Sequence, residues 1–321
     1  MEKDATGRAN TLAPGSTRYK LRRLGRDIWR DRQLYLLLAP TIIWLIIFHY
    51  IPIYGIQISF KNYTPGLSME AAPWVGFKFF RQYLQSPLFW PMIRNTLTLS
   101  IYGIVAGFPL PIIFALLLNE LKSARYKKIN QTVTYAPNFI STVVLCGMII
   151  LFFNPSYGPL VLLLKSMGIR VGNLLTSTTA FKHVYVWSGV WQGTGWSCII
   201  YLSALSSVDP SLHEAAVIDG ATRIQRIWHI NLPMILPTIM ITLIMNCGGI
   251  LGTSFEKVYM LQNDMNLEVS RVISTYTYEQ GLLGGKFSFT TAIGLFNTVI
   301  NFIVLMGVNW LSKKTTEISF L

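Results

Sequence analysis

Long apolar stretches constrain the fold of this chain more than any other feature. Of its 321 residues 52% are hydrophobic, and several apolar runs exceed the length that a helix needs to cross a bilayer, about 18 residues. A helix satisfies its own backbone hydrogen bonds, which lipid cannot do. The sequence therefore predicts an all-α, multi-pass membrane protein rather than a soluble enzyme. Six transmembrane helices are expected, at residues 34–60, 91–118, 133–153, 183–205, 233–255 and 290–311.

The cations predict how the chain is oriented. By the positive-inside rule, the basic segment ahead of the first span lies in the cytoplasm, and six spans return the other end to the same side. That segment contains Arg18, Lys20, Arg22, Arg23, Arg26, Arg30 and Arg32. The expected organisation is a basic cytoplasmic tail with an interfacial helix (1–33), a first transmembrane helix (34–60), a core transmembrane domain (91–311) that includes a cytoplasmic loop (206–232), and a cytoplasmic C-terminal segment (312–321).

The composition disfavours nucleic-acid binding, metal binding and catalysis by this chain. The formal net charge of +13 is explained by cations next to the membrane, which face anionic lipid. The three cysteines lie apart in predicted spans and form no disulfide framework or metal spacing. The nearest approach to a P-loop, Gly285-Lys286, has Gln280 in place of its first glycine and Phe287 in place of Ser or Thr. We expect no catalytic residue, no metal and no nucleic-acid partner.

The cytoplasmic loop carries the most specific pattern in the chain. Residues 214–233 read E-A-A-x3-G-x9-I-x-L-P, which fixes seven positions over twenty residues. Asp209-Pro210 is typical of a helix start, since aspartate caps the first turn and proline needs no hydrogen-bond partner there. Gly220 allows the backbone to turn, and Thr222 can cap a second helix. The loop is therefore predicted to be a helix–turn–helix.

This pattern resembles the coupling loop of permease subunits in ATP-binding-cassette (ABC) importers. The segments Trp191–Trp196 and Tyr201–Leu205, and Tyr278 with Gln280 and Gly281, are similar to the carbohydrate branch of that family. Within the branch the chain most resembles importers of large oligosaccharides and polysaccharides, including the membrane subunits of the alginate importer. The resemblance implies the transmembrane fold of type I ABC importers, in a bacterial inner membrane.

The resemblance also implies the partners and the coupling residues. Such a permease hydrolyses nothing; it works with a second permease chain, two ATPase subunits that bind ATP and magnesium, and a periplasmic or lipid-anchored solute-binding protein. By this resemblance the residues that transmit movement from the ATPase are Glu214, Ala215, Ala216, Gly220, Ile230, Leu232 and Pro233.

Polar residues at membrane depth are candidates for the substrate path, because they are costly there unless they serve a cavity or a helix contact. The candidates are Gln192, Thr194, Asn246, Asn297 and Asn301. Asn297 and Asn301 are four residues apart and share a helix face. The alternative is that these side chains hold neighbouring helices together.

The charge of the outer loops favours an acidic cargo. They carry five acids against these ten cations: Lys61, Lys78, Arg81, Arg94, Lys165, Arg170, Lys182, Lys257, Arg271 and Lys286. A positive outer face attracts uronate oligomers, such as those of alginate. The same cations could instead dock an acidic binding protein. A neutral oligosaccharide as cargo and a non-transporting scaffold or receptor both stay open.

Overall fold

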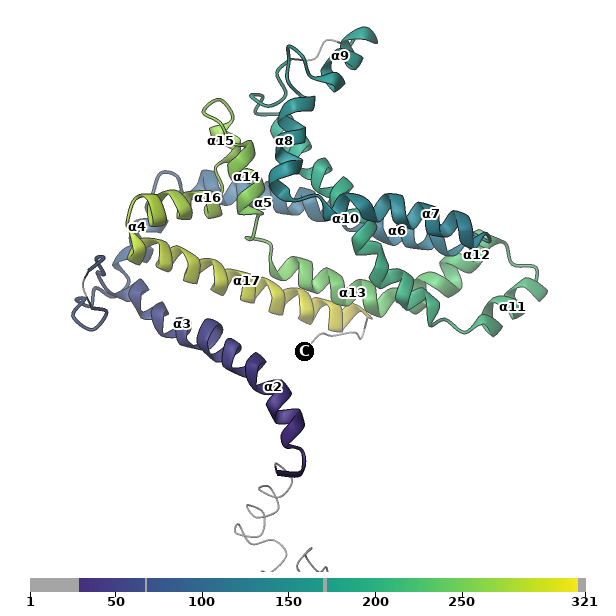
Figure 1. The fold of residues 1–321 in the computed structure, drawn as a ribbon, viewed down its shortest axis with the longest axis horizontal. Coiled ribbons are helices and arrows are strands. Elements are labelled where there is room, and N and C mark those ends of the chain that lie inside the picture. The colour runs from purple at the N-terminus through teal and green to yellow at the C-terminus, as the bar shows by residue number, and fades with distance from the viewer. Residues whose placement is uncertain (1–28, 67, 170–171, 317–321) are drawn as a thin grey trace, which may run out of the picture. The chain divides into compact units, whose positions relative to one another are not determined.

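The computed structural model describes residues 29–66, 68–169 and 172–316, and the chain divides into two compact units, residues 1–57 and 58–321. Figure 1 shows that helices make up nearly all of the described chain. The single β contact among these residues is an isolated bridge between Lys61 and Trp74. The predicted all-α class is therefore confirmed. Most of the predicted basic tail (1–28) and the last part of the C-terminal segment (317–321) lie outside the described residues.

The first apolar stretch forms a continuous helix of 29 residues, Arg32–Phe60. It begins after Asp31, whose carboxylate accepts a hydrogen bond from Arg30 Nε at 3.1 Å. Pro40 lies inside the helix and removes one backbone donor. The helix is long and apolar enough to cross a membrane, and it coincides with the predicted first span. Its segments are α2 (Arg32–Leu45), the π-helical η1 (Ile46–Tyr50), α3 (Ile51–Ile53) and the 3₁₀-helical η2 (Tyr54–Phe60).

The second unit is built around five long elements. Helix α10 packs against α5 and α6, and α13 packs against α17 (Figure 1). Three helical stretches of this unit are long and apolar enough to span a membrane: Phe89–Asn119, Arg223–Gly248 and Phe287–Thr316. The elements concerned are α5 (Phe89–Gly107), α6 (Pro109–Asn119), α10 (Ala180–Ser206), α13 (Leu232–Gly248) and α17 (Phe287–Thr316).

Helix α10 covers the predicted fourth span without being uniformly apolar. Its 27 residues extend over about 40 Å at a rise of 1.5 Å per residue, enough for a bilayer core. Polar and small residues such as Ser188, Gln192 and Gly193 interrupt its apolar character. Among the described helices, four are both long and apolar enough to span a membrane, and α10 is not one of them. The total of six spans stays a prediction.

The structure breaks the predicted third span in two. Helix α7 (Ala124–Tyr135) continues through the 3₁₀ turn η3 (Ala136–Phe139) and then meets α8 (Thr142–Phe152) at a bend of 95°. Pro137 has no N–H with which to continue the α-helical hydrogen bonds, and after the 3₁₀ turn Ile140 is extended, with a ψ of 125°. Ser141 starts the new helix, because its side chain accepts a hydrogen bond from the Val144 N–H at 3.3 Å. The expectation of one uninterrupted helix over 133–153 was therefore wrong.

The predicted fifth span also ends early. Helix α13 stops at Gly248, and a turn follows in which the Gly252 N–H donates to the Gly249 carbonyl at 2.7 Å. Adjacent glycines favour such a turn because they lose the most backbone entropy in a helix. Other short elements are α4 (Lys78–Leu84), α9 (Pro159–Ser166), α14 (Phe255–Leu261), α15 (Leu267–Ser270), α16 (Ile273–Tyr278) and the π-helical η5 (Glu279–Leu283).

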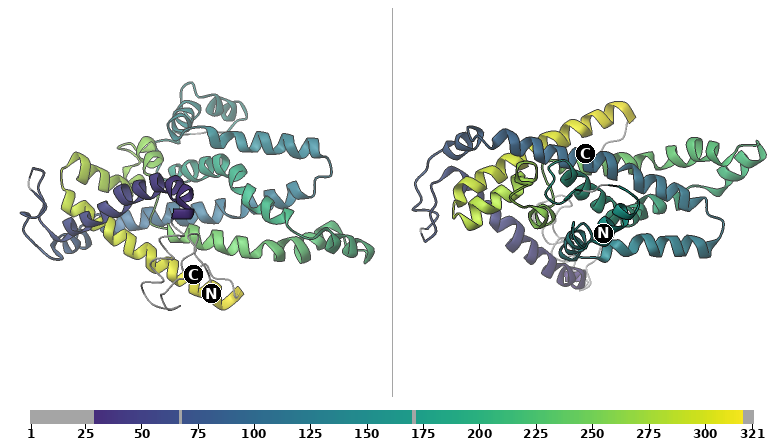
Figure 2. Two further views of the ribbon diagram at one scale, coloured as in Figure 1. Left: turned by 60° about the horizontal axis from the view of Figure 1, so that its bottom comes forward. Right: turned by 90° about the horizontal axis from the view of Figure 1, so that it is seen from above.

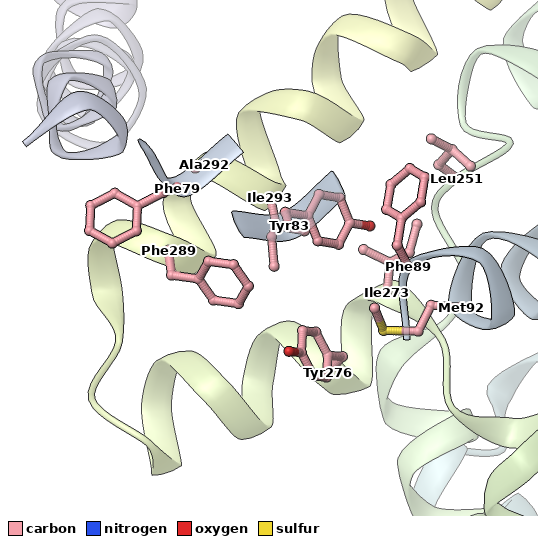
Figure 3. Close-up of a cluster of buried hydrophobic side chains, with 10 residues drawn as sticks. All are labelled: Phe79, Tyr83, Phe89, Met92, Leu251, Ile273, Tyr276, Phe289, Ala292 and Ile293. Atoms are coloured by element: carbon pink, nitrogen blue, oxygen red, sulfur yellow. The ribbon is translucent and has the colours of Figure 1, made fainter. Parts of the chain in front are cut away.

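A cluster of aromatic and aliphatic side chains joins α4, α5, α16 and α17 (Figure 3). Tyr83 at its centre is 1% exposed, and its ring meets that of Phe89 edge to face at 5.0 Å between centroids. Each fully buried side chain of this size contributes about 1.5–3 kcal/mol. Figures 1 and 2 show α4 and α16 at one end of the unit, with α11 at the other.

Candidate functional site

The first of two candidate sites is the hairpin made by α11 (Pro210–Ile218) and α12 (Arg223–Arg226), called the α11–α12 hairpin below. Asp209 caps α11, because its carboxylate accepts a hydrogen bond from the Ser211 N–H at 2.9 Å. The same backbone bond holds the pKa of Asp209 below its usual value. Pro210 takes the first helical position, as the sequence predicts.

Gly220 makes the turn between the two helices. Its φ is +79°, a backbone conformation that L side chains rarely adopt. The Gly220 N–H donates to the Val217 carbonyl at 3.1 Å, and the Ala221 N–H donates to the Ala216 carbonyl at 2.9 Å. These bonds satisfy carbonyls that the end of α11 would otherwise leave open.

Thr222 and Gln225 fix the start of the second helix. The Thr222 N–H donates to Gln225 Oε1 at 2.7 Å, and the Gln225 N–H donates to Thr222 Oγ1 at 3.4 Å. This reciprocal pair is a capping box. Helix α12 then runs through the π-helical η4 (Ile227–Asn231) into α13, so the hairpin is connected to the bundle by a continuous helix.

The α11–α12 hairpin exposes apolar side chains. Ile218 is 85% exposed and Ile224 69%, and Trp228 of the adjoining η4 is 62% exposed. Of the residues predicted to couple to an ATPase, Glu214, Ala215, Gly220 and Pro233 are exposed, and Ala216, Ile230 and Leu232 are half-buried.

A hollow of about 300 Å³ lies in the α11–α12 hairpin. It is lined by Ala216, Asp219, Gly220, Ala221, Gln225, Arg226, His229 and Ile230. Asn231, which the E-A-A pattern leaves unspecified, is fully buried, and its amide approaches Glu120 Oε1 at 3.5 Å. No sequence signal marks that contact, because the two residues are more than a hundred positions apart.

The second candidate site is a cavity of about 460 Å³ among α5, α6, α10, the end of α13 and α14. The predicted pathway residues Gln192, Thr194 and Asn246 all line it. The amide of Gln192 donates to the Ile140 carbonyl at 2.8 Å, at the bend before α8. Gln192 therefore lines the cavity and also binds the Ile140 backbone carbonyl, at the bend between η3 and α8.

The other two predicted pathway residues lie elsewhere. Asn301 Oδ1 accepts a hydrogen bond from the Leu251 N–H at 3.0 Å, which ties α17 to the turn after α13. Asn297 Oδ1 is buried and makes no hydrogen bond with the described residues. Neither asparagine lines the cavity. The sequence placed both on one helix face but could not indicate which neighbour that face meets.

Lys257 of α14 is the one charged side chain among the described residues that line the cavity. It is 6% exposed, and its ammonium donates to the Tyr185 carbonyl at 2.8 Å. Burial lowers the pKa of Lys257 to about 8, so the side chain is mostly charged at neutral pH. In the sequence Lys257 is one of ten outer cations and nothing sets it apart. Its burial arises because α14 folds back against α8.

A glycine lets α10 lie directly against α7. A Cβ at Gly195 would collide with the backbone carbonyl of Thr134 in α7. Any larger residue there would separate the two helices and alter the cavity that α10 lines. Among the described residues, no three His, Cys, Asp or Glu side chains gather as a metal site would require.

The described chain thus combines apolar helices long enough to span a membrane, a polar cavity and an exposed hairpin, which is the arrangement expected of a membrane-embedded transport subunit. Residues 107–317 match the family described as the binding-protein-dependent transport system inner membrane component, and the chain belongs to that family.

Individual relatives place the chain among sugar permeases. It is 39% identical to protein LplB of Bacillus subtilis (strain 168) over 285 residues, which cover 89% of this chain and 90% of that protein. It is also 39% identical, over 298 residues and 93% of each chain, to the polygalacturonan/rhamnogalacturonan transport system permease protein YteP of that organism. The fold is similar to that of a chain from a bacterial ABC transporter involved in the import of the acidic polysaccharide alginate, with a TM-score of 0.84 and 41% identity over 92% of this chain and 99% of that chain. The chain is thus a sugar ABC transporter permease with the membrane-domain fold of type I importers.

Proposed function

We propose that this permease imports acidic oligosaccharides, such as uronate oligomers, and forms half of their translocation path. The observation that carries the proposal is the likeness over 92% of the chain to a subunit of an importer of an acidic polysaccharide. The cavity supports it, because polar groups and a buried cation line a space inside an otherwise apolar bundle. The excess of outer cations in the sequence favours the same cargo.

The α11–α12 hairpin is proposed to receive the movement of a separate ATPase. Its exposed apolar side chains, above all Ile218, would be costly in water without a partner. The continuous helix from α12 into α13 offers a stiff connection from this surface to the cavity wall. In this proposal two ATPase subunits bind ATP and magnesium, and this chain hydrolyses nothing.

The family and the charge pattern support a proposal for the rest of the assembly. A solute-binding protein, periplasmic or lipid-anchored, delivers the sugar to the end opposite the hairpin, and a second permease chain completes the path. The basic N-terminal tail supports a cytoplasmic position for both termini of a chain in a bacterial inner membrane. Cations of the hairpin's end, including Arg223 and Arg226, agree with a cytoplasmic hairpin.

The cargo is tested by reconstituting the chain in liposomes with its partner permease, ATPase and binding protein. ATP hydrolysis is measured with oligogalacturonate or alginate oligomers and, in parallel, with maltodextrins. We expect acidic oligomers to stimulate hydrolysis and maltodextrins to leave the basal rate unchanged. Stimulation by maltodextrins alone would identify a neutral cargo, and stimulation by neither sugar would favour a non-transporting scaffold.

The coupling role is tested with Glu214→Lys, which reverses the charge of an exposed side chain. We expect normal insertion and folding, because Glu214 is exposed and contributes little to helix packing, together with loss of sugar-stimulated ATP hydrolysis. Normal stimulation in this variant would remove Glu214 from the coupling surface.

A further inference from the structure

Lys257 is a buried cation without an acidic partner in the described part of the chain. Its side chain is 6% exposed, and among the described residues the one ion pair within 4.0 Å joins Arg30 to Asp31. Glu256, the neighbour of Lys257 in the chain, is exposed. Buried lysines are rare unless they are paired, because removing an ammonium from water costs several kcal/mol.

The ammonium retains unused hydrogen-bonding capacity. A lysine has three N–H donors, and one of them is given to the Tyr185 carbonyl at 2.8 Å. The ammonium also lies over the Tyr185 ring, 5.0 Å from its centroid, which stabilises the charge without using a donor. Up to two donors therefore remain for a ligand in the cavity that Lys257 lines.

A second group on the cavity wall also lacks a partner among the described residues. The hydroxyl of Ser100 in α5 is buried without a hydrogen bond, and Ser100 lines the same cavity as Lys257. Gly189 leaves the space in which the ammonium sits, because a Cβ there would be 3.1 Å from Lys257 Nζ. The wall thus combines a free cationic donor, a free hydroxyl and a glycine that accommodates the lysine.

We propose that Lys257 binds a carboxylate of the sugar inside the cavity and thereby selects acidic over neutral oligosaccharides. The inference rests on the proposed function and deepens it, because it assigns the selection to one residue within the membrane domain. A uronate carboxylate supplies the negative charge that the buried ammonium lacks. Charge-assisted hydrogen bonds of this kind are short and about twice as strong as neutral ones. A neutral sugar can accept a hydrogen bond from the ammonium but brings no negative charge to offset the buried cation.

The competing account is that Lys257 merely ties α14 to α10 through the Tyr185 carbonyl. Lys257→Gln separates the two accounts, since glutamine keeps a donor for that carbonyl but carries no charge. Lys165→Gln is the matched control. Lys165 also donates to a backbone carbonyl, that of Pro155 at 2.8 Å, but it is exposed and does not line the cavity.

The experiment uses the complete transporter in liposomes with its binding protein, at pH 7, and oligogalacturonate as the probe. The wild-type complex is measured first, so that a failure of the proposed cargo is seen before any variant is read. We expect Lys257→Gln to raise the half-saturating concentration of oligogalacturonate at least about tenfold. Lys257→Arg should restore most of the response, and Lys165→Gln should behave as the wild type.

Three results would overturn the inference. An unchanged oligogalacturonate response in Lys257→Gln would show that the charge is not used. An equal loss in Lys257→Gln and Lys257→Arg, with a lowered basal rate, would show a structural role. A wild-type complex that responds to maltodextrins but not to oligogalacturonate would overturn the acidic cargo and, with it, the role of Lys257.

Discussion

The α11–α12 hairpin and the cavity differ in opposite ways from the usual burial pattern, in which apolar side chains are buried and charged ones are exposed. In the hairpin Ile218 and Ile224 are apolar and exposed, as is Trp228 of the adjoining η4. In the cavity wall Lys257 is charged and buried, and the Ser100 hydroxyl has no partner among the described residues. Each arrangement is unfavourable for the chain by itself, the first because apolar surface meets water and the second because a charge leaves it.

The difference between the two regions indicates the chemistry of what completes each. An exposed apolar surface is stabilised by burial against another protein, whereas a buried cation is stabilised by an anion small enough to reach it. The hairpin is therefore interpreted as a protein contact and the cavity as a ligand site. The following predictions separate the two regions experimentally.

The largest effect is expected for Gly220→Pro. Proline fixes φ near −65°, whereas this position has a φ of +79°, and it removes the N–H that donates to the Val217 carbonyl. A cost of about 3 kcal/mol or more should distort the hairpin and lower sugar-stimulated ATP hydrolysis about a hundredfold. The matched control is Gly168→Pro, since Gly168 has a φ of +80° and an N–H that donates to the Lys165 carbonyl, but follows α9. An equal loss in both variants would contradict a special role for the hairpin.

The next effect concerns binding of the ATPase. Ile218→Asp places a charge where we expect an apolar contact, and full burial of such a side chain is worth about 1.5–3 kcal/mol. The dissociation constant for the ATPase in detergent should therefore rise roughly tenfold to a hundredfold. Leu282→Asp alters a residue of η5 that is 72% exposed, and it should leave ATPase binding unchanged. Unchanged binding in Ile218→Asp would remove this residue from the interface.

A third prediction uses pH to remove the charge from the cavity. The pKa of Lys257 is lowered to about 8 by burial, so raising the pH through this value deprotonates the ammonium and should weaken a bound carboxylate. Between about pH 7 and pH 9 the charged fraction falls about tenfold, and the oligogalacturonate response should fall with it. The oligogalacturonate-stimulated rate of the wild type is divided by that of Lys257→Arg at the same pH. The guanidinium stays charged, so this ratio removes pH effects that do not come from residue 257.

Two other titratable groups act on this ammonium, the Cys146 thiol of α8 and the Tyr185 phenol of α10. Lys257→Gln keeps both of them and is the control for their titration. If the ratio of the Lys257→Gln rate to the Lys257→Arg rate falls with pH as the wild-type ratio does, the fall does not come from Lys257.

The smallest effect is expected for Gly189→Ala. The new Cβ would be 3.1 Å from Lys257 Nζ, so the flexible lysine must shift by a few tenths of an ångström. The half-saturating concentration of oligogalacturonate should rise by roughly threefold. Gly193→Ala is matched to it, because Gly193 lines the same cavity on the same helix but has open space around a Cβ. Equal effects of the two variants would mean that the position of the ammonium does not matter.

Local sequence patterns predicted the hairpin well because its geometry depends on neighbouring residues. Asp209, Gly220 and Thr222 make their hydrogen bonds within three positions of themselves, as the cap and turn rules expect. Apolar length likewise predicted the helices of the first, second and sixth expected spans to within about five residues, whereas the helix of the fifth, Arg223–Gly248, begins and ends earlier than the predicted 233–255. The bend after Pro137 was missed, since an apolar run has the same composition whether or not its helix is broken.

The sequence by itself determined an all-helical membrane protein with a capped hairpin between two apolar segments, since both depend on apolar length and on bonds between near neighbours. Only the tertiary structure decided which polar residues share a cavity. It brought Ser100, Gln192 and Lys257 to one space and directed Asn301 to the turn after α13. The physical reason is that burial of Lys257 depends on how α14 lies against α8 and α10, and such long-range contacts leave no trace in the spacing of residues along the chain.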